Sequence, residues 1–220
     1  MHTQVKALIT ALVAAAALAA LVGSASANSL SVTSRTIRVV WSSFEFTKPV
    51  TVRCRLTIEG TLHENTISKV SGSLIGYITA AAIAHPCTGG SEWVYNGVER
   101  NEALGNAVLP SSFPWHLTYE GFNGSLPTPT AIRILLTLAR FLLRSSPFGI
   151  PILCLYRTGS NGNATLTGNL GVGGRVTSVR ASGTIRSETG GCPERTLRNP
   201  EGDGIATQLG NSNSVSITLI

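Results

Sequence analysis

Ionisable side chains that could act together in a reaction gather in one short stretch of the sequence. Glu59 ends a strand-like segment, and His63 and Glu64 follow within five positions. A carboxylate that orients an imidazole beside a serine hydroxyl is the core of many hydrolytic sites. The candidate catalytic residues are therefore His63, Glu59 and Glu64, with a nearby serine as the nucleophile. The competing interpretation is that a His–Glu pair beside a turn is ordinary protein surface.

Motifs of the common enzyme and cofactor classes are absent from the sequence. It contains no GxSxG, no HExxH and no Walker phosphate loop. The glycine cluster at residues 171–174 precedes a strand-like segment, whereas a phosphate-binding loop precedes a helix. We therefore predict that the protein needs no cofactor, and the balance of the sequence favours a non-enzymatic role.

The four cysteines are Cys54, Cys87, Cys154 and Cys192. An even number of cysteines in an exported chain predicts disulfide bonds. Three pairings are open, and we favour the sequential one, Cys54–Cys87 and Cys154–Cys192, because the two spans are similar and each closes beside glycines. The sequence has no CxxC pair and no histidines at the spacing of zinc ligands, so it predicts no metal site.

The first 27 residues have the organisation of a secretory signal peptide. Lys6 supplies the positive charge, residues 7–22 are apolar, and Ala25-Ser26-Ala27 offers a cleavage site before Asn28. The alanine-rich apolar run is typical of bacteria, and it is shorter than the ~20 residues of a transmembrane helix. We expect residues 1–27 to be removed. Residues 28–220 then form one exported β-rich domain, secreted or in the cell envelope, without a transmembrane anchor.

The charge pattern limits the classes of partner. The chain carries 17 basic and 11 acidic residues, for a net charge of +6, and the arginines are scattered singly. Nucleic-acid-binding proteins cluster basic residues on one element with aromatics between them, so we predict no nucleic-acid partner. A basic surface is compatible with weak attraction to anionic envelope polymers.

Short strands separated by turns dominate the predicted structure. Residues 50–58 alternate strictly between apolar and polar side chains, which predicts a half-buried strand with Cys54 on its buried face. Glu59-Gly60 is a predicted turn, with residues 61–68 as the returning strand. Comparable strand signals cover residues 36–41, 73–84, 115–122, 152–157, 164–170, 175–188 and 214–220. This spacing favours a mainly β fold, an antiparallel sandwich or a barrel-like sheet.

Residues 73–84 could also form a short buried helix, although the flanking Gly72 and Pro86 favour a strand. Residues 130–145 are the main helix candidate. Arg133, Thr137, Arg140 and Arg144 would form one helical stripe and the leucines would fill the other side, with Pro129 and Pro147 at the ends. We predict that this amphipathic helix covers a sheet, and contact with an anionic membrane is the alternative.

Aromatic residues could line a groove for envelope glycans, or they could form the core. The residues in question are Trp41, Trp93, Trp115, Tyr77, Tyr95 and Tyr119. Trp115 and His116, between Pro114 and a strand, have the most exposed setting. A core position is the more common role for aromatics on alternating strands.

Three segments carry a resemblance to known sequences. They are TISKVSGSLIGYITAAAIAHPCTGG (residues 66–90), PWHLTYEGFNGSLP (residues 114–127) and CLYRT (residues 154–158). In this order they resemble a group of secreted actinobacterial proteins without an assigned function. The resemblance implies an exported, disulfide-containing protein and implies no activity.

The sequence thus favours a non-enzymatic extracellular or envelope-associated binding or structural β-domain. Two alternatives stay open: a small secreted hydrolase with its site near His63, and a subunit of a membrane β-barrel, in which apolar side chains face outward.

Overall fold

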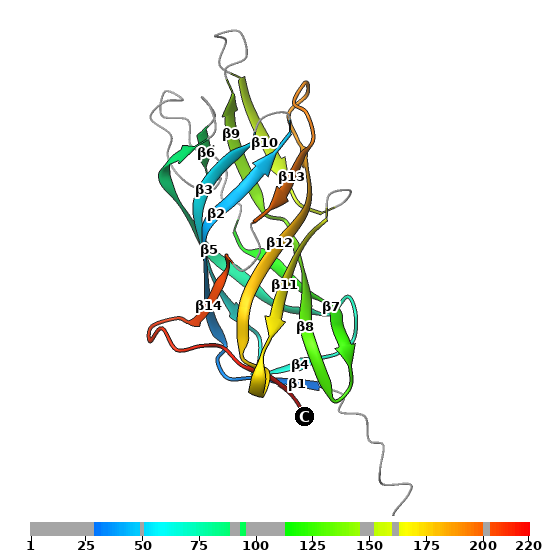
Figure 1. Ribbon diagram of the computed structural model, residues 1–220. Helices are drawn as coiled ribbons and strands as arrows, with labels where there is room; N and C mark the ends of the chain where they lie inside the picture. The colour runs from blue at the N-terminus through cyan, green and yellow to red at the C-terminus, as the bar shows by residue number, and fades with distance from the viewer. Residues whose placement is uncertain are drawn as a thin grey trace, which may run out of the picture.

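The computed structural model describes residues 29–48, 51–88, 93–95, 113–145, 152–159, 163–199 and 203–220. The predicted signal peptide and its cleavage site lie outside these residues. The described chain consists of β-strands joined by turns (Figure 1). Every pairing between these strands is antiparallel. The predicted mainly β, antiparallel fold class is confirmed.

Eight strands form a closed ring in which each strand pairs with the ring strand that comes next in chain order. In order, they are β2 (Thr36–Thr47), β3 (Val52–Leu62), β5 (Leu74–Thr88), β7 (Trp115–Ser125), β8 (Thr128–Thr137), β11 (Ala164–Leu170), β12 (Val176–Ser187) and β13 (Arg195–Arg198). Pairing of β13 with β2 closes the ring. An antiparallel ring of this size has an interior that side chains fill or that holds one small ligand.

The alternation of side chains makes the ring apolar inside and polar outside. In β3 the inward positions from Val52 to Leu62 are buried and carry apolar side chains, apart from Gly60. The outward positions of β3 carry Arg53, Arg55, Thr57, Glu59 and Thr61. Hydrophobic burial on the inner face therefore holds the strand in this register, because a slip of one residue would turn the arginines inward.

Further strands extend the ring at both ends (Figure 1). At one end, β1 (Ser29–Val32) pairs with β4 (Thr66–Ser68) and β15 (Ile217–Leu219) in a three-stranded sheet, here called the cap sheet. At the other end, β9 (Arg140–Ser145), β10 (Ile152–Arg157) and β6 (Trp93–Tyr95) lengthen one wall. β14 (Ile205–Gln208) pairs with β2 beyond the residues that pair with β13.

The predicted helix over residues 130–145 is wrong. The segment forms β8 and β9, which are paired on both sides with other strands. Leu138, between the two strands, has a positive φ of 62° and interrupts the alternation. Arg133 and Arg140 consequently both make ion pairs on the outer surface, with Glu120 and Glu188. The arginine spacing indicated a helix only because an unbroken strand would place these residues on opposite faces.

The predicted turn at Glu59-Gly60 is also wrong. β3 continues through these residues to Leu62, and its partner is β5 rather than the segment that follows it. Gly60 allows the two strands to approach, because a Cβ atom there would lie 2.7 Å from the carbonyl oxygen of Tyr77. The glycine therefore serves close packing inside a strand, and β4 pairs with β1 instead.

Both disulfide bonds have the predicted sequential pairing. Cys54 of β3 is bonded to Cys87 of β5, and Cys154 of β10 is bonded to Cys192, which precedes β13. Cys54 lies on the buried face, as the alternation predicts. The first bond links neighbouring ring strands and the second attaches the extended wall to the strand that closes the ring.

A buried carboxylate joins three strands near the β2–β13 pairing that closes the ring. Glu45 of β2 accepts a hydrogen bond from Arg53 of β3 at 2.7 Å and another from Arg198 of β13 at 2.7 Å. The bond from Arg53 lowers the pKa of Glu45 most; burial opposes this change, and Arg198 lowers the pKa further. The result is a pKa below the ordinary value of 4.5.

We expect Glu45→Gln to destabilise the fold by about 1.5–3 kcal/mol at pH 7, the range for a hydrogen bond to a charged group. Because the folded-state pKa is lowered, the stabilisation by Glu45 is full above the unfolded-state value and disappears as the pH falls through the folded-state value. Urea denaturation between pH 7 and pH 3 should therefore show a smaller loss of stability in the variant. Glu194→Gln, at the exposed pair with Arg186, is the matched control. An equal effect of both substitutions would contradict this role.

Candidate functional site

The structure does not assemble the predicted catalytic residues into a site. The Glu59 carboxylate accepts a hydrogen bond from Arg38 at 2.8 Å on the outer face of the ring. The His63 side chain is exposed and lies against the Tyr77 ring, with centroids 5.0 Å apart, and Glu64 is exposed beside it. Within the described residues, no hydrogen bond joins His63 to either carboxylate. The hypothesis depended on a turn at Glu59-Gly60, which the continuous strand β3 replaces.

The aromatic residues with described burial are mostly core. Trp41, Trp115 and Tyr119 are at most 1% exposed, so the exposed setting predicted for Trp115 is wrong, and these three side chains cannot line a surface groove. Tyr77 is half-buried on the outer surface, between the rings of His63 and His116. The side chains of Trp93 and Tyr95 lie outside the described residues.

The aromatic side chains fill one half of the ring interior. Trp41 contacts Phe44, which contacts Phe46, and Phe141 packs against both Phe46 and Trp115. Neighbouring ring centroids lie 5.2–5.5 Å apart. The Trp41 indole also donates a hydrogen bond to the Val179 carbonyl at 2.9 Å. This half of the interior is packed around a small space of about 10 Å³.

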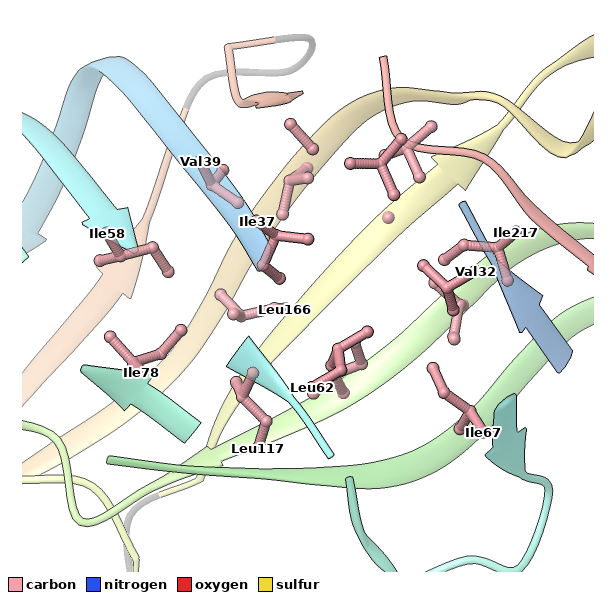
Figure 2. Close-up of a pocket in the computed structure, with 17 residues that line it drawn as sticks. Val32, Ile37, Val39, Ile58, Leu62, Ile67, Ile78, Leu117, Leu166 and Ile217 are labelled. Carbon is pink, nitrogen blue, oxygen red and sulfur yellow. The ribbon is translucent and has the colours of Figure 1, made fainter. Parts of the chain in front are cut away.

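The other half of the interior, next to the cap sheet, contains a larger cavity of about 70 Å³. Figure 2 shows side chains from opposite walls that point into it. The ring strands contribute Ile37, Val39, Ile58, Ile78, Leu117 and Leu166. Each strand of the cap sheet also contributes a residue, and these are Val32, Ile67 and Ile217.

The cavity is lined almost wholly by aliphatic carbon. All of its lining residues are Ala, Val, Leu, Ile or Gly, and none carries a polar or ionisable side chain. A water molecule in such a space would lack hydrogen-bond partners, so cavities of this kind stay dry and take up apolar atoms. The arrangement has no group that could transfer a proton or act as a nucleophile. Its chemistry suits the binding of apolar groups.

A surface groove of about 460 Å³ lies outside the cap sheet. Its walls are the β7–β8 turn at Pro127–Pro129, the 3-10 turn Val172–Gly174, and β15. Ile217 of β15 lines both this groove and the inner cavity. One strand therefore separates the two spaces.

Among the described residues, no three His, Cys, Asp or Glu side chains gather as metal ligands. In that same part of the chain, no helix has the length and apolar character needed to cross a bilayer.

Comparison with known proteins adds no relative. No protein-family model matches the chain, and no curated protein or solved structure matches it significantly.

Sequence reasoning missed the cavity because its walls come from distant parts of the chain. Ile37 and Ile217, for example, belong to β2 and β15. The available signal was the aliphatic composition of the inward positions. Near the cap sheet these positions carry Ile, Leu and Val, whereas the packed half contains the large aromatic rings.

Proposed function

We propose that this protein is a non-enzymatic, exported binding domain that holds a short alkyl group inside its ring of strands. The observation that carries the proposal is the dry aliphatic cavity beneath the cap sheet. An eight-stranded ring is large enough to hold one small ligand, and the apolar lining selects its chemical class.

The volume of the cavity limits what enters it. An engineered aliphatic cavity of about 150 Å³ binds benzene or xenon. A cavity of about 70 Å³ is roughly half that size and accommodates a xenon atom or a short alkyl segment. The ligand is therefore a small apolar molecule or the end of a longer chain.

Export is supported by two independent features. The N-terminal 27 residues have the pattern of a signal peptide. The two disulfides are compatible with folding in an oxidising compartment. Both features accord with a domain that works outside the cell or in its envelope.

The two alternative functions have less support. A hydrolase would need His63 beside a carboxylate and a nucleophile, and Glu59 is instead engaged by Arg38. A membrane barrel subunit would need an apolar outer face, and the outer face of β3 carries arginines, threonines and a glutamate.

We expect xenon to bind in the cavity, and the isoleucines of the protein allow a direct test. In protein labelled with 13C at the isoleucine δ1 methyl groups, xenon should shift the methyl resonances of lining residues such as Ile58, Ile78 and Ile132. Ile83 and Ile185, which are buried elsewhere, are internal controls and should not shift. Shifts of equal size at all five residues would contradict the proposal.

A cavity-filling variant provides the second arm of the test. Ala206→Leu adds three carbons at a lining position and should abolish the xenon-induced shifts. Thr207→Leu places the same side chain at the next residue of β14, which does not line the cavity, and should leave the shifts unchanged. Persistence of the shifts in Ala206→Leu would show that xenon binds elsewhere.

A further inference from the structure

The inner cavity and the outer groove share a wall, and this wall is thin. Ile217 is 7% exposed and lines both spaces, while Thr218 and Leu219 line only the groove. β15 is three residues long and pairs with β1 along one edge. Displacement of these few residues would join the groove to the cavity.

The other edge of β15 is covered by a glycine-rich turn. A Cβ atom on Gly174, which has a φ of 71°, would lie 2.1 Å from the Ile217 carbonyl oxygen, so only glycine permits this approach. Val172, at the start of the same turn, is fully exposed. No side chain of this turn covers β15, because Gly174 has none and Val172 projects into solvent.

The groove differs from the cavity in chemistry. It combines apolar residues, such as Pro129 and Leu219, with the hydroxyl-bearing Thr128 and Thr218. None of its described lining residues is acidic, and the exposed Arg175 directly follows Gly174. A molecule with an anionic polar end and an alkyl chain matches this combination.

We propose that the groove binds the body and the anionic head of a single-chain amphiphile, and that the end of its alkyl chain passes Ile217 into the ring. This inference rests on the proposed function, because the cavity must first accept an alkyl group. It adds the route of uptake and the chemical class of the ligand. The groove volume of about 460 Å³ receives the part of the chain that the inner cavity cannot hold.

A crosslink across the cap sheet tests the route. Ser31 and Thr218 are paired neighbours on β1 and β15, and neither side chain is buried. In the Ser31→Cys/Thr218→Cys variant, the oxidised form should take up cis-parinaric acid, a fluorescent single-chain fatty acid, at least tenfold more slowly than the reduced form. Wild-type protein with and without the reductant controls for the native disulfides. Equal rates in the two forms would overturn the proposed route.

A groove-filling variant tests whether the head and body of the amphiphile lie in the groove. Thr128→Trp should weaken the binding of decanoate at least tenfold in calorimetry and leave the xenon-induced methyl shifts unchanged. Ser182→Trp, at an exposed position on β12 away from the groove, should bind decanoate like the wild type. Unchanged decanoate binding by Thr128→Trp would overturn the groove assignment. Xenon binding without any decanoate binding would contradict this inference alone. If neither xenon nor decanoate bound, the proposed function would be contradicted as well.

Discussion

Replacement of Trp41 by alanine should cost about 3–5 kcal/mol of stability, the range for truncating a large buried aromatic residue. Trp41 is 0% exposed and packs edge-on against Phe44, with ring centroids 5.5 Å apart. Its loss would also leave the Val179 carbonyl without the indole hydrogen bond. Urea denaturation followed by circular dichroism would measure the change.

Two comparisons separate packing from hydrogen bonding at Trp41. Trp41→Phe retains most of the apolar volume and loses the indole N–H, so we expect a loss of about 1–3 kcal/mol from the unsatisfied carbonyl. Trp41→Ala opens space beside Ile58 and Leu166, which also line the cavity beneath the cap sheet. Added indole should therefore stabilise Trp41→Ala and have little effect on the wild type. A Trp41→Ala variant as stable as the wild type would contradict this assignment of the core.

Removal of either disulfide should lower the stability of the fold about as much as Trp41→Ala does. The bonds join residues 33 and 38 positions apart. Chain entropy alone predicts a loss of about 3–4 kcal/mol for a loop of this length, because the uncrosslinked unfolded chain gains freedom. The variants Cys54→Ala/Cys87→Ala and Cys154→Ala/Cys192→Ala would be compared with the wild type by urea denaturation.

Removal of the second bond should leave the cavity intact. Cys154–Cys192 attaches the wall of β9 and β10, far from the cap sheet, and its removal should leave xenon binding intact once the protein is folded. A loss of less than about 1 kcal/mol in both double variants would contradict the chain-entropy argument, which predicts a penalty from loop length alone.

Local patterns predicted several strands but not their partners, and they predicted a helix where β8 and β9 lie. The strict alternation around Cys54 placed β3 and its buried face, and β10 and β11 have the predicted limits, Ile152–Arg157 and Ala164–Leu170. Gly60 indicates a turn in the sequence. In the structure it lies within β3 and allows β3 and β5 to approach closely. Residue type alone does not distinguish these two uses of glycine.

The binding cavity was beyond sequence reasoning for a different reason. Ionisable residues such as His63 and Glu59 attract attention because their chemistry is visible in isolation. The groups that form the cavity are ordinary aliphatic side chains, and their significance comes from a space between them that the aromatic residues do not fill. Such a space depends on how β1, β4 and β15 close one end of the ring, which no local pattern encodes.

The order of strands around the ring has a consequence for the folding pathway. Each ring strand pairs with its successor, so an open sheet can grow from one end as the chain emerges. The exception is the seam between β2 and β13, where Thr47 and Thr196 meet across 149 positions of sequence. Loop closure makes such distant pairing slow, and until the seam forms the facing edges of β2 and β13 are unpaired and open to other chains. We therefore expect aggregation during refolding to depend on how fast this seam closes, with Glu45 and Arg198 among the first contacts across it.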